Sequence, residues 1–549
     1  MKKTTQRKHH HWLQHCILPA VSASLLAGGL PAALHASPPS TAQVDSSING
    51  AKHGVDAKLR ANVQHIVVIY QENWSFDSLY GQFPGVDGLQ NGFDTLPQLD
   101  AASGYSNVLA QTPIPKTGFP AVPDPQFPNV AGKLAFFYNT NVPLPLIPYD
   151  FTHYTASNAL TGDIVHRFYH EQLQIDNGVL EPKLGYMDKF VTWSDNPGLV
   201  LSYIDATGMP EGKLAQQYTM CDRFFHSAYG GSFLNHQWLI AAASPPWTAA
   251  IPAGFTSSYD PVTRKLADNQ LTFDGVYAVN TVQPLLAPFV PGTSPVKRLL
   301  INNTDPTQPG YTPNIGNRLD DAGISWKWYS GGWSLALTDN VAANAALFQF
   351  HHQPFAYYTK YAPFSDTNGT PNPATTGPAA HLQDEQEFFT DVNWHRLPAV
   401  TFIKPLGPNN EHPGYADEVT GQQHVADLVA AIQKSPYAKD TVIIITYDEN
   451  GGRWDHVVPP VRPDGWGVGT RVPGIIISPW SKGGLVDSNE YETVSILKLI
   501  ERRFRLAPLA VRDADPAVSD LTTAFNWDHE HGLAVPGPTQ VESQPLLNQ

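Results

Sequence analysis

Two short groups of polar side chains, rich in carboxylates, follow segments that are expected to form buried strands. Asp448 and Glu449 directly follow a long β-branched run, and Glu72 and Asn73 follow a second apolar run at residues 66–70. In open α/β sheets, ligands bind beyond the carboxyl ends of the strands. Adjacent carboxylates repel each other, and a divalent cation with oxygen ligands relieves that repulsion. One such loop is equally well explained as an acidic turn, but two of the same design favour a metal site.

A hydroxyl group that could act as a nucleophile follows two glycines. Gly230 and Gly231 allow a tight turn, and Ser232 then opens an apolar helix expected at residues 233–243. A hydroxyl at a helix N-terminus faces unpaired N–H groups and the positive end of the helix dipole, which suits a phosphate. Serine is also a favoured N-cap, and on this motif alone that alternative stays open.

Further polar side chains accompany these motifs. Asn235 and His236 lie one turn into the apolar helix, which does not need them for packing. His166, His170 and Glu171 fall on neighbouring turns of another expected helix. A single histidine on such a helix is more often a packing residue than a catalyst, so these histidines are candidates only in combination.

The elements that must position these groups predict an α/β domain with a mostly parallel central sheet and flanking helices. Uninterrupted β-branched runs are typical of strands buried on both faces of a parallel sheet. Strands are expected at residues 66–70, 399–404, 441–446 and 473–478, and an amphipathic helix at 493–504.

The domain organisation follows from changes in composition along the chain. An α/β domain is expected at residues 61–510, after a flexible lead-in at 37–60 and before a C-terminal tail at 511–549. Proline-rich stretches at about 84–150 and 246–345 are interpreted as long loop insertions.

Composition and charge restrict the class of protein. Hydrophobic residues make up 42% of the 549 residues and charged residues only 15%, which indicates a folded globular chain. The formal charge of −15 makes nucleic acid an improbable partner on electrostatic grounds.

The N-terminus has the pattern of a targeting segment. Residues 1–36 combine a basic start with a small-residue apolar run, which predicts a signal peptide and a periplasmic or secreted protein. A single transmembrane anchor is the alternative, and Pro19 and Pro31 weaken it. With Cys16 inside the signal, Cys221 would be left alone, so no intramolecular disulfide is expected.

Four motifs together resemble the bacterial phosphoesterase family that includes phospholipases C and acid phosphatase A. They read QENWSFD at residues 71–77, GGSFLNH at 230–236, NEHPG at 410–414 and YDENGGRWDH at 447–456. The resemblance covers most of residues 62–505 in the expected order.

The resemblance implies an alkaline-phosphatase-like fold with one divalent metal ion. It assigns Ser232 as the nucleophile. The metal ligands that it implies are Glu72, Asn73, Asp448 and Glu449, and the catalytic histidines are His166, His412 and one of His351 and His352, taken as His352. Asn235, His236 and His456 are assigned to substrate binding.

The function predicted from these assignments is that of an exported acid phosphatase, which hydrolyses small phosphate monoesters through a phosphoserine at Ser232. Family members with phospholipase C activity usually read Gly-Pro-Thr-x-Pro-Asn where this chain reads Gly-Gly-Ser-Phe-Leu-Asn, which favours the acid phosphatase branch. The alternatives are a phospholipase C or phosphodiesterase acting on phospholipid head groups, and an exported cation-binding protein without enzymatic activity.

A pH dependence is also expected. An unperturbed histidine titrates near ~6.5, and the nearby carboxylates are expected to raise the pKa of His166 or His412 by favouring the cation. If one of them protonates the leaving group, activity should fall as it deprotonates.

Overall fold

The structure of the protein is a computed structural model. It describes residues 54–92, 98, 148–153, 156–176, 185–195, 199–260, 262, 265–280, 300–363, 380–481 and 483–528. The chain divides into two units, residues 1–51 and 52–549, and all described residues belong to the second. The expected signal peptide lies outside the described residues. Within them, no helix combines the length and hydrophobicity needed to cross a membrane.

A mixed sheet of eight strands forms the centre of the fold. From edge to edge it consists of β13 (Leu485–Asp487), β4 (Thr219–Cys221), β12 (Gly474–Ile477), β11 (Thr441–Tyr447), β1 (His65–Gln71), β10 (Val400–Lys404), β8 (Trp326–Ser330) and β9 (Leu382–Asp384). β1 pairs in parallel with both β10 and β11, and β12 alone runs antiparallel to its two neighbours. The predicted mostly parallel sheet is therefore confirmed.

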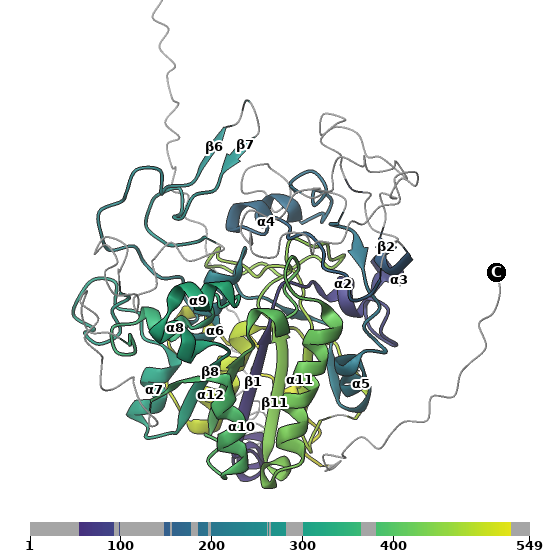
Figure 1. Cartoon of the computed structure of the whole chain (residues 1–549), viewed down its shortest axis with the longest axis vertical. Coiled ribbons are helices and arrows are strands. Elements are labelled where there is room, and N and C mark those ends of the chain that lie inside the picture. The colour runs from purple at the N-terminus through teal and green to yellow at the C-terminus, as the bar shows by residue number, and fades with distance from the viewer. Residues whose placement is uncertain are drawn as a thin grey trace, which may run out of the picture. The chain divides into compact units, whose positions relative to one another are not determined.

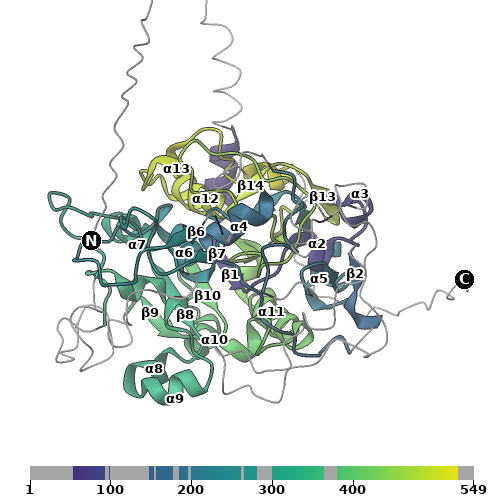
Figure 2. The same ribbon diagram turned by 90° about the horizontal axis from the view of Figure 1, so that it is seen from above.

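Two layers of helices cover the sheet, which explains why its central strands are apolar throughout. α5 (Pro210–Gln217) and α10 (Glu385–Asn393) pack beside α11 (Glu418–Gln433) on one face, whereas α6 (Ser232–Ala241) packs beside α7 (Ile315–Asp321) and α12 (Thr493–Phe504) on the other (Figures 1 and 2). Every residue of β11 is buried, as expected for a strand covered on both faces.

Shorter elements connect this three-layer core. In chain order they are α2 (Phe76–Tyr80), α3 (Leu89–Gly92), β2 (Tyr149–Asp150), η4 (Phe151–His153), α4 (Phe168–Ile175), β3 (Ser202–Tyr203), β5 (Phe224–Phe225), β6 (Ser258–Asp260), β7 (Lys265–Ala267), α8 (Trp333–Thr338), α9 (Asn340–Ala345), η6 (Phe350–His352), η7 (Pro354–Tyr357), η8 (Gly407–Asn409), η9 (Pro436–Lys439), β14 (Tyr491–Glu492), α13 (Val511–Ala514) and η10 (Thr522–Ala524).

The structure differs from the expected organisation at three places. Residues 54–62 are helical rather than part of a flexible lead-in, and Leu59 is fully buried. The expected insertion at 246–345 contains β8, a strand of the central sheet. The expected tail begins with α13 and still contributes Phe525 to the core. Most of the other expected insertion, 84–150, lies outside the described residues.

Cys221 ends β4, inside the sheet. It is fully buried.

Candidate functional site

The carboxyl ends of β1 and β11 bring the two acidic motifs together. Asn73 follows β1 with a positive φ of 65°, and its backbone N–H donates to Asp448 Oδ1 at 3.1 Å. The Asp448 N–H donates in turn to the carbonyl of Gln71 at 3.1 Å. Glu72 and Glu449 are both fully buried beside this junction, so the strand order converts two distant motifs into one cluster of carboxylates.

Ser232 is the first residue of α6, behind the turn that the two glycines make. Gly230 has a φ of +86°, and a Cβ there would lie 2.4 Å from the backbone N of Phe168. The Gly230 N–H donates to Glu171 Oε2 at 2.6 Å, while Glu171 Oε1 accepts from His226 Nε2 at 2.8 Å. Because α4 holds this turn from outside, the serine is presented by a fixed backbone rather than by a free loop.

Asn235 also holds this turn. Its Nδ2 donates to the carbonyl oxygens of Ala228 at 3.1 Å and Gly230 at 3.0 Å, and its Oδ1 accepts from the Ala228 N–H at 3.1 Å. These backbone bonds occupy the Asn235 amide, so this residue lies behind the turn that presents Ser232. Its expected role in substrate binding stays a prediction.

Glu72 connects Ser232 with two buried nitrogen groups, the ring of His352 and the ammonium group of Lys404. The Ser232 hydroxyl donates to Glu72 Oε2 at 3.4 Å. The other carboxylate oxygen, Oε1, lies 2.9 Å from His352 Nε2 and pairs with Lys404 Nζ. The two oxygens of one carboxylate therefore face in different directions, one towards the hydroxyl and one towards buried nitrogen groups.

His236 lies within the same group of side chains. Its Nδ1 contacts the carbonyl of Ser232 at 2.7 Å, and its ring stacks on that of His352 at a centroid distance of 5.2 Å. Its Nε2 lies 3.9 Å from Glu72 Oε1. Glu72, His236 and His352 each offer a ligand atom within 4.8 Å of the others, which is a nitrogen-containing donor set that sequence reasoning did not predict.

His166 and His412 flank Asn73 on another side of the site. Asn73 Nδ2 lies 3.4 Å from His166 Nε2 and 3.1 Å from His412 Nε2. The Nδ1 atoms of these histidines contact the carbonyl oxygens of Ile164 and Pro413. We infer that Nδ1 carries the proton in both rings and that each Nε2 presents a lone pair to the site. The spacing of His166 predicted a position on a helix, but the residue precedes α4.

Burial and repulsion control the protonation of the carboxylates. Burial alone would raise the pKa of Glu72, but His352 and Lys404 outweigh it and hold that pKa well below its usual range. Burial and the neighbouring Glu72 raise the pKa of Asp448 to about 7, and burial together with Asp448 raises that of Glu449 well above its usual value. The protein alone therefore carries more negative groups here than it can stabilise as anions.

The histidines behave differently from the sequence-based expectation. Burial lowers the pKa of His166 to about 4 and that of His412 to about 3, although Glu72 acts in the opposite direction. Burial also lowers the pKa of His236 and His352. The expectation that carboxylates raise these values is wrong, because removal of the rings from water outweighs the attraction to nearby anions.

The donors that the site offers fit a divalent metal ion. Asn73 Oδ1 and Glu449 Oε1 are buried and accept no hydrogen bond from any described group. Buried polar atoms of this kind are costly unless a ligand satisfies them. Carboxylate and amide oxygens suit hard divalent cations, and neutral imidazole nitrogens suit transition metals, so both donor sets agree with a metal site at Glu72.

His456 belongs to a different cluster. Its Nδ1 lies 2.6 Å from Asp77 Oδ2, and its Nε2 lies 3.0 Å from Asp87 Oδ1. Arg471, which is fully buried, donates to Asp77 Oδ1 and to Asp455 Oδ1, each at 2.9 Å. We call Asp77, Asp455, His456 and Arg471 the arginine cluster. None of the hydrogen bonds found for His456 among the described residues reaches the serine site. Its expected role in substrate binding stays a prediction.

The sequence-predicted residues can now be sorted by position. The structure brings together Ser232, Glu72, Asn73, Asp448, Glu449, His166, His236, His352 and His412, and places Asn235 and His456 elsewhere. Sequence reasoning missed Lys404 as a member of the site. Its position at the end of a predicted strand, level with the two acidic motifs, was the available signal.

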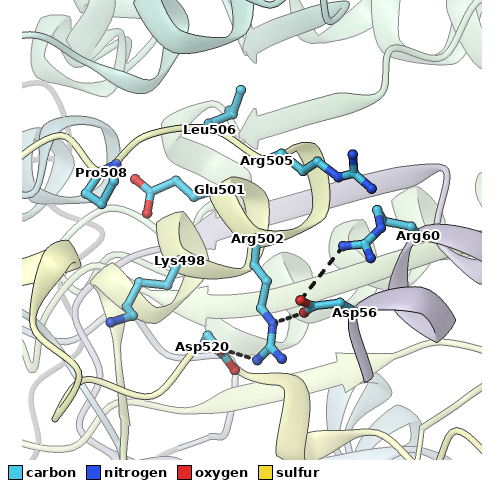
Figure 3. Close-up of a pocket in the computed structure, with 9 residues that line it drawn as sticks. All are labelled: Asp56, Arg60, Lys498, Glu501, Arg502, Arg505, Leu506, Pro508 and Asp520. Carbon is cyan, nitrogen blue, oxygen red and sulfur yellow. Dashed lines mark hydrogen bonds and ion pairs between the residues drawn. The ribbon is translucent and has the colours of Figure 1, made fainter. Parts of the chain in front are cut away.

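A separate cavity of about 590 Å³ lies near the C-terminal end of α12 (Figure 3). Its lining residues are Asp56, Arg60, Lys498, Glu501, Arg502, Arg505, Leu506, Pro508 and Asp520. Arg502 pairs with both Asp56 and Asp520. The cavity shares no residue with the serine site. The positive charge of Arg502 in the cavity is already neutralised by its two aspartate partners.

The fold and site define an α/β protein with a buried serine among carboxylates and neutral histidines. The chain belongs to the Phosphoesterase family, whose sequence model matches residues 63–507, and it is thus a phosphoric ester hydrolase. Phospholipase C B of Mycobacterium tuberculosis is 25% identical over 519 residues, which cover 89% of this chain and 81% of that enzyme. The non-hemolytic phospholipase C of Pseudomonas aeruginosa is 24% identical and aligns with 90% of this chain and 62% of that enzyme.

A solved structure of a protein in the alkaline phosphatase superfamily from Vibrio parahaemolyticus is also similar to this chain. It has a TM-score of 0.30 at 12% identity, covering 57% of this chain and 63% of the other.

Proposed function

We propose that the protein cleaves phosphodiesters of the phospholipid head-group type, as a phospholipase C, through a covalent intermediate on Ser232. The observation that carries this proposal is the hydroxyl of Ser232, which opens α6 and donates to Glu72 at 3.4 Å inside a buried cluster of carboxylates and histidines. Relatives with the name phospholipase C align along most of this chain, which supports the diester as substrate.

A divalent cation would be held by Glu72, Asn73, Asp448 and Glu449, with His236 and His352 as further donors. When bound, such an ion neutralises phosphate oxygens and lowers the pKa of a nearby hydroxyl. The buried acceptor oxygens of Asn73 and Glu449 support this assignment.

The chain's own residues carry out the displacement. Ser232 Oγ passes its proton to Glu72 Oε2, the acceptor of its hydrogen bond, and forms a bond to phosphorus. The bond from phosphorus to the leaving alcohol breaks, the alcohol leaves with a proton from an imidazolium, and a phosphoester remains on the serine. In the second step a water oxygen attacks this ester and Ser232 leaves with a proton. The fixed turn in front of α6 keeps Oγ in place, and the first N–H groups of the helix point at the bound anion.

His166 and His412 handle protons in this scheme. At rest both are neutral, because burial lowers the pKa of His166 to about 4 and that of His412 to about 3. Each Nε2 lone pair can accept a proton from the attacking water. An anionic phosphate in contact raises the pKa of either ring, so the imidazolium that protonates a leaving alcohol forms only with substrate bound.

A phosphate monoesterase is the second candidate. The sequence Gly-Gly-Ser-Phe-Leu-Asn around Ser232 resembles the acid phosphatase branch of the family. A monoester dianion would place more negative charge beside Glu72, which is buried and ionised. That repulsion favours the diester unless a cation compensates for it.

Hydrolysis by the purified protein tests the proposal. Release of phosphocholine from phosphatidylcholine is compared with phosphate release from p-nitrophenyl phosphate at matched pH, with and without a chelator. We expect the diester to be cleaved faster, with loss of activity in chelator. Ser232→Ala should lower turnover by several orders of magnitude while its far-UV circular dichroism stays unchanged. Near-normal turnover in that variant would refute the covalent role of Ser232, and a faster reaction with the monoester would establish the second candidate.

A further inference from the structure

A fully buried lysine lies inside the serine site. Lys404 is the last residue of β10, and its side chain is 0% exposed. Its Nζ pairs with Glu72 Oε1, donates to the carbonyl of Gln71 at 3.4 Å, and lies 5.4 Å from the centre of the Tyr70 ring. Burial of an ammonium group is costly and is tolerated only with close anionic partners. All three contacts lie on consecutive residues of one segment, so the lysine is fitted to the end of β1.

The position of Lys404 determines how Glu72 faces the nucleophile. Lys404 and His352 both approach Oε1, which leaves Oε2 as the oxygen that accepts from Ser232 at 3.4 Å. Among the described groups, Lys404 is the only one with a permanent positive charge that contacts the Glu72 carboxylate. Lys404 is thus a positioning residue, which acts on Ser232 through Glu72.

The lysine also changes the charge of the site. When a bound cation keeps all three carboxylates ionised, Glu72, Asp448 and Glu449 contribute three negative charges, and Lys404 reduces the sum to two. Buried charge is tolerated when it is compensated, and a total of −2 is compensated by one divalent cation. Trivalent cations would overcompensate this site, whereas a site without Lys404 would match them.

We propose that Lys404 is a built-in cation of the catalytic centre, which orients Glu72 towards Ser232 and sets the charge of the site to match one divalent cation. This inference rests on the proposed function only in that it assumes a metal beside Ser232.

Cation binding to the metal-free protein tests the inference without reference to activity. The full chain is stripped with a chelator and titrated with Mn²⁺ and with Tb³⁺, followed by calorimetry and by Tb³⁺ luminescence. Wild type should bind one Mn²⁺. Lys404→Met and Lys404→Gln should bind both ions more tightly, by about tenfold or more, with the larger gain for Tb³⁺. Lys404→Arg retains the charge and should keep the wild-type preference.

Two controls make the result decisive. Lys189→Met removes another buried lysine, which pairs with Asp176 at the end of α4 at 3.1 Å, and it should leave both affinities unchanged. If the neutral variants of Lys404 do not fold, Glu72→Gln/Lys404→Met removes both members of the pair and keeps the site at −2. Its preference between the two ions should then equal that of wild type.

Either of two results would overturn the inference: folded neutral variants that bind both ions no more tightly than wild type, or a double variant with a shifted preference. These failures are distinct from failure of the proposed function. Active Ser232→Ala protein would refute the serine mechanism and leave the cation titrations valid. A wild-type protein that binds no Mn²⁺ would refute both the metal and this role of Lys404.

Discussion

Two clusters take carboxylates from the same two segments of the chain, and they differ in the groups that neutralise these carboxylates. The serine site uses Glu72 and Glu449, whereas the arginine cluster uses Asp77 and Asp455 a few residues further along each segment. Arg471 enters the second cluster and pairs with both of its aspartates. In the serine site, buried oxygens of Asn73 and Glu449 accept no hydrogen bond from any residue that the structure describes.

The comparison shows that residue types alone do not identify a metal site. Both Glu72 with His236 and His352, and Asp77 with Asp455 and His456, have the composition and proximity that metal binding needs. A guanidinium supplies five donors and a permanent charge, so a cluster that contains one is already complete. The cluster that lacks enough internal cations is the candidate for binding an external ion.

The largest expected effect separates the two clusters by activity. Glu449→Gln should lower kcat/KM by about a thousandfold or more and reduce bound metal, because it removes a charged oxygen ligand. Asp455→Asn, in the same loop, should retain its metal and its activity per folded molecule. The measurements are elemental analysis and diester hydrolysis. Full metal occupancy in Glu449→Gln, or metal loss in Asp455→Asn, would contradict the distinction.

For the stability of the fold, the arginine cluster should matter more than the serine site. Arg471→Met leaves Asp455 buried without its guanidinium and leaves Asp77 with His456 alone, and loss of one partner of a buried ion pair costs about 3–5 kcal/mol. Urea unfolding of the metal-free proteins measures this loss. Arg396→Met removes a half-exposed guanidinium from Asp391, which keeps Lys327 as a partner, and should cost less than about 1 kcal/mol. Equal losses in the two variants would show that the arginine cluster does not stabilise the fold.

The arginine cluster should also make stability depend on pH. Burial alone would lower the pKa of His456, but Asp77 outweighs it and raises the pKa to about 9. A raised folded-state pKa stabilises the protein in full below the unfolded value of ~6.5, and this contribution is lost as the pH rises through about 9. The loss should reach roughly 3 kcal/mol. His456→Asn should abolish that slope between pH 6.5 and 9.5, as measured by urea unfolding at a series of pH values.

The smallest expected effect is stabilisation by the metal itself. A cation that binds only the folded chain adds about 2.7 kcal/mol at one hundred times its Kd. Thermal unfolding with and without Mn²⁺ should show this gain in wild type and in Asp455→Asn, but a reduced gain in Glu449→Gln. An identical gain in all three proteins would place the ion outside the serine site.

The sequence was informative where the signal is local. The β-branched run of β11 predicts a buried strand, and the structure confirms it and buries Asp448 and Glu449 directly after it. By contrast, β8 reads WKWYS within a proline-rich stretch, without an aliphatic run, and its place in the sheet was not predicted. The cluster around His456 includes Arg471, which lies on another loop. The sequence close to His456 therefore did not reveal this partner.

The remaining failures concern burial, which depends on segments far apart in the chain. Lys404 resembles an ordinary lysine at a strand end, and only the pairing of β10 with β1 places it against Glu72. The pKa values of His166 and His412 fall because several distant segments enclose them together. No pattern within one segment carries that information.

The backbone of the serine site is interlocked, and this has a consequence for chimeric proteins. Gly451 has a φ of +60°, and a Cβ there would lie 2.3 Å from the carbonyl oxygen of Asn73. At Gly452 the corresponding Cβ would lie 2.7 Å from the carbonyl oxygen of Val165. Three loops from distant parts of the chain therefore meet backbone to backbone. A chimera in which one of these loops is replaced by the loop of a relative should not form the site unless the other two loops come from the same relative. The three loops therefore have to be exchanged together.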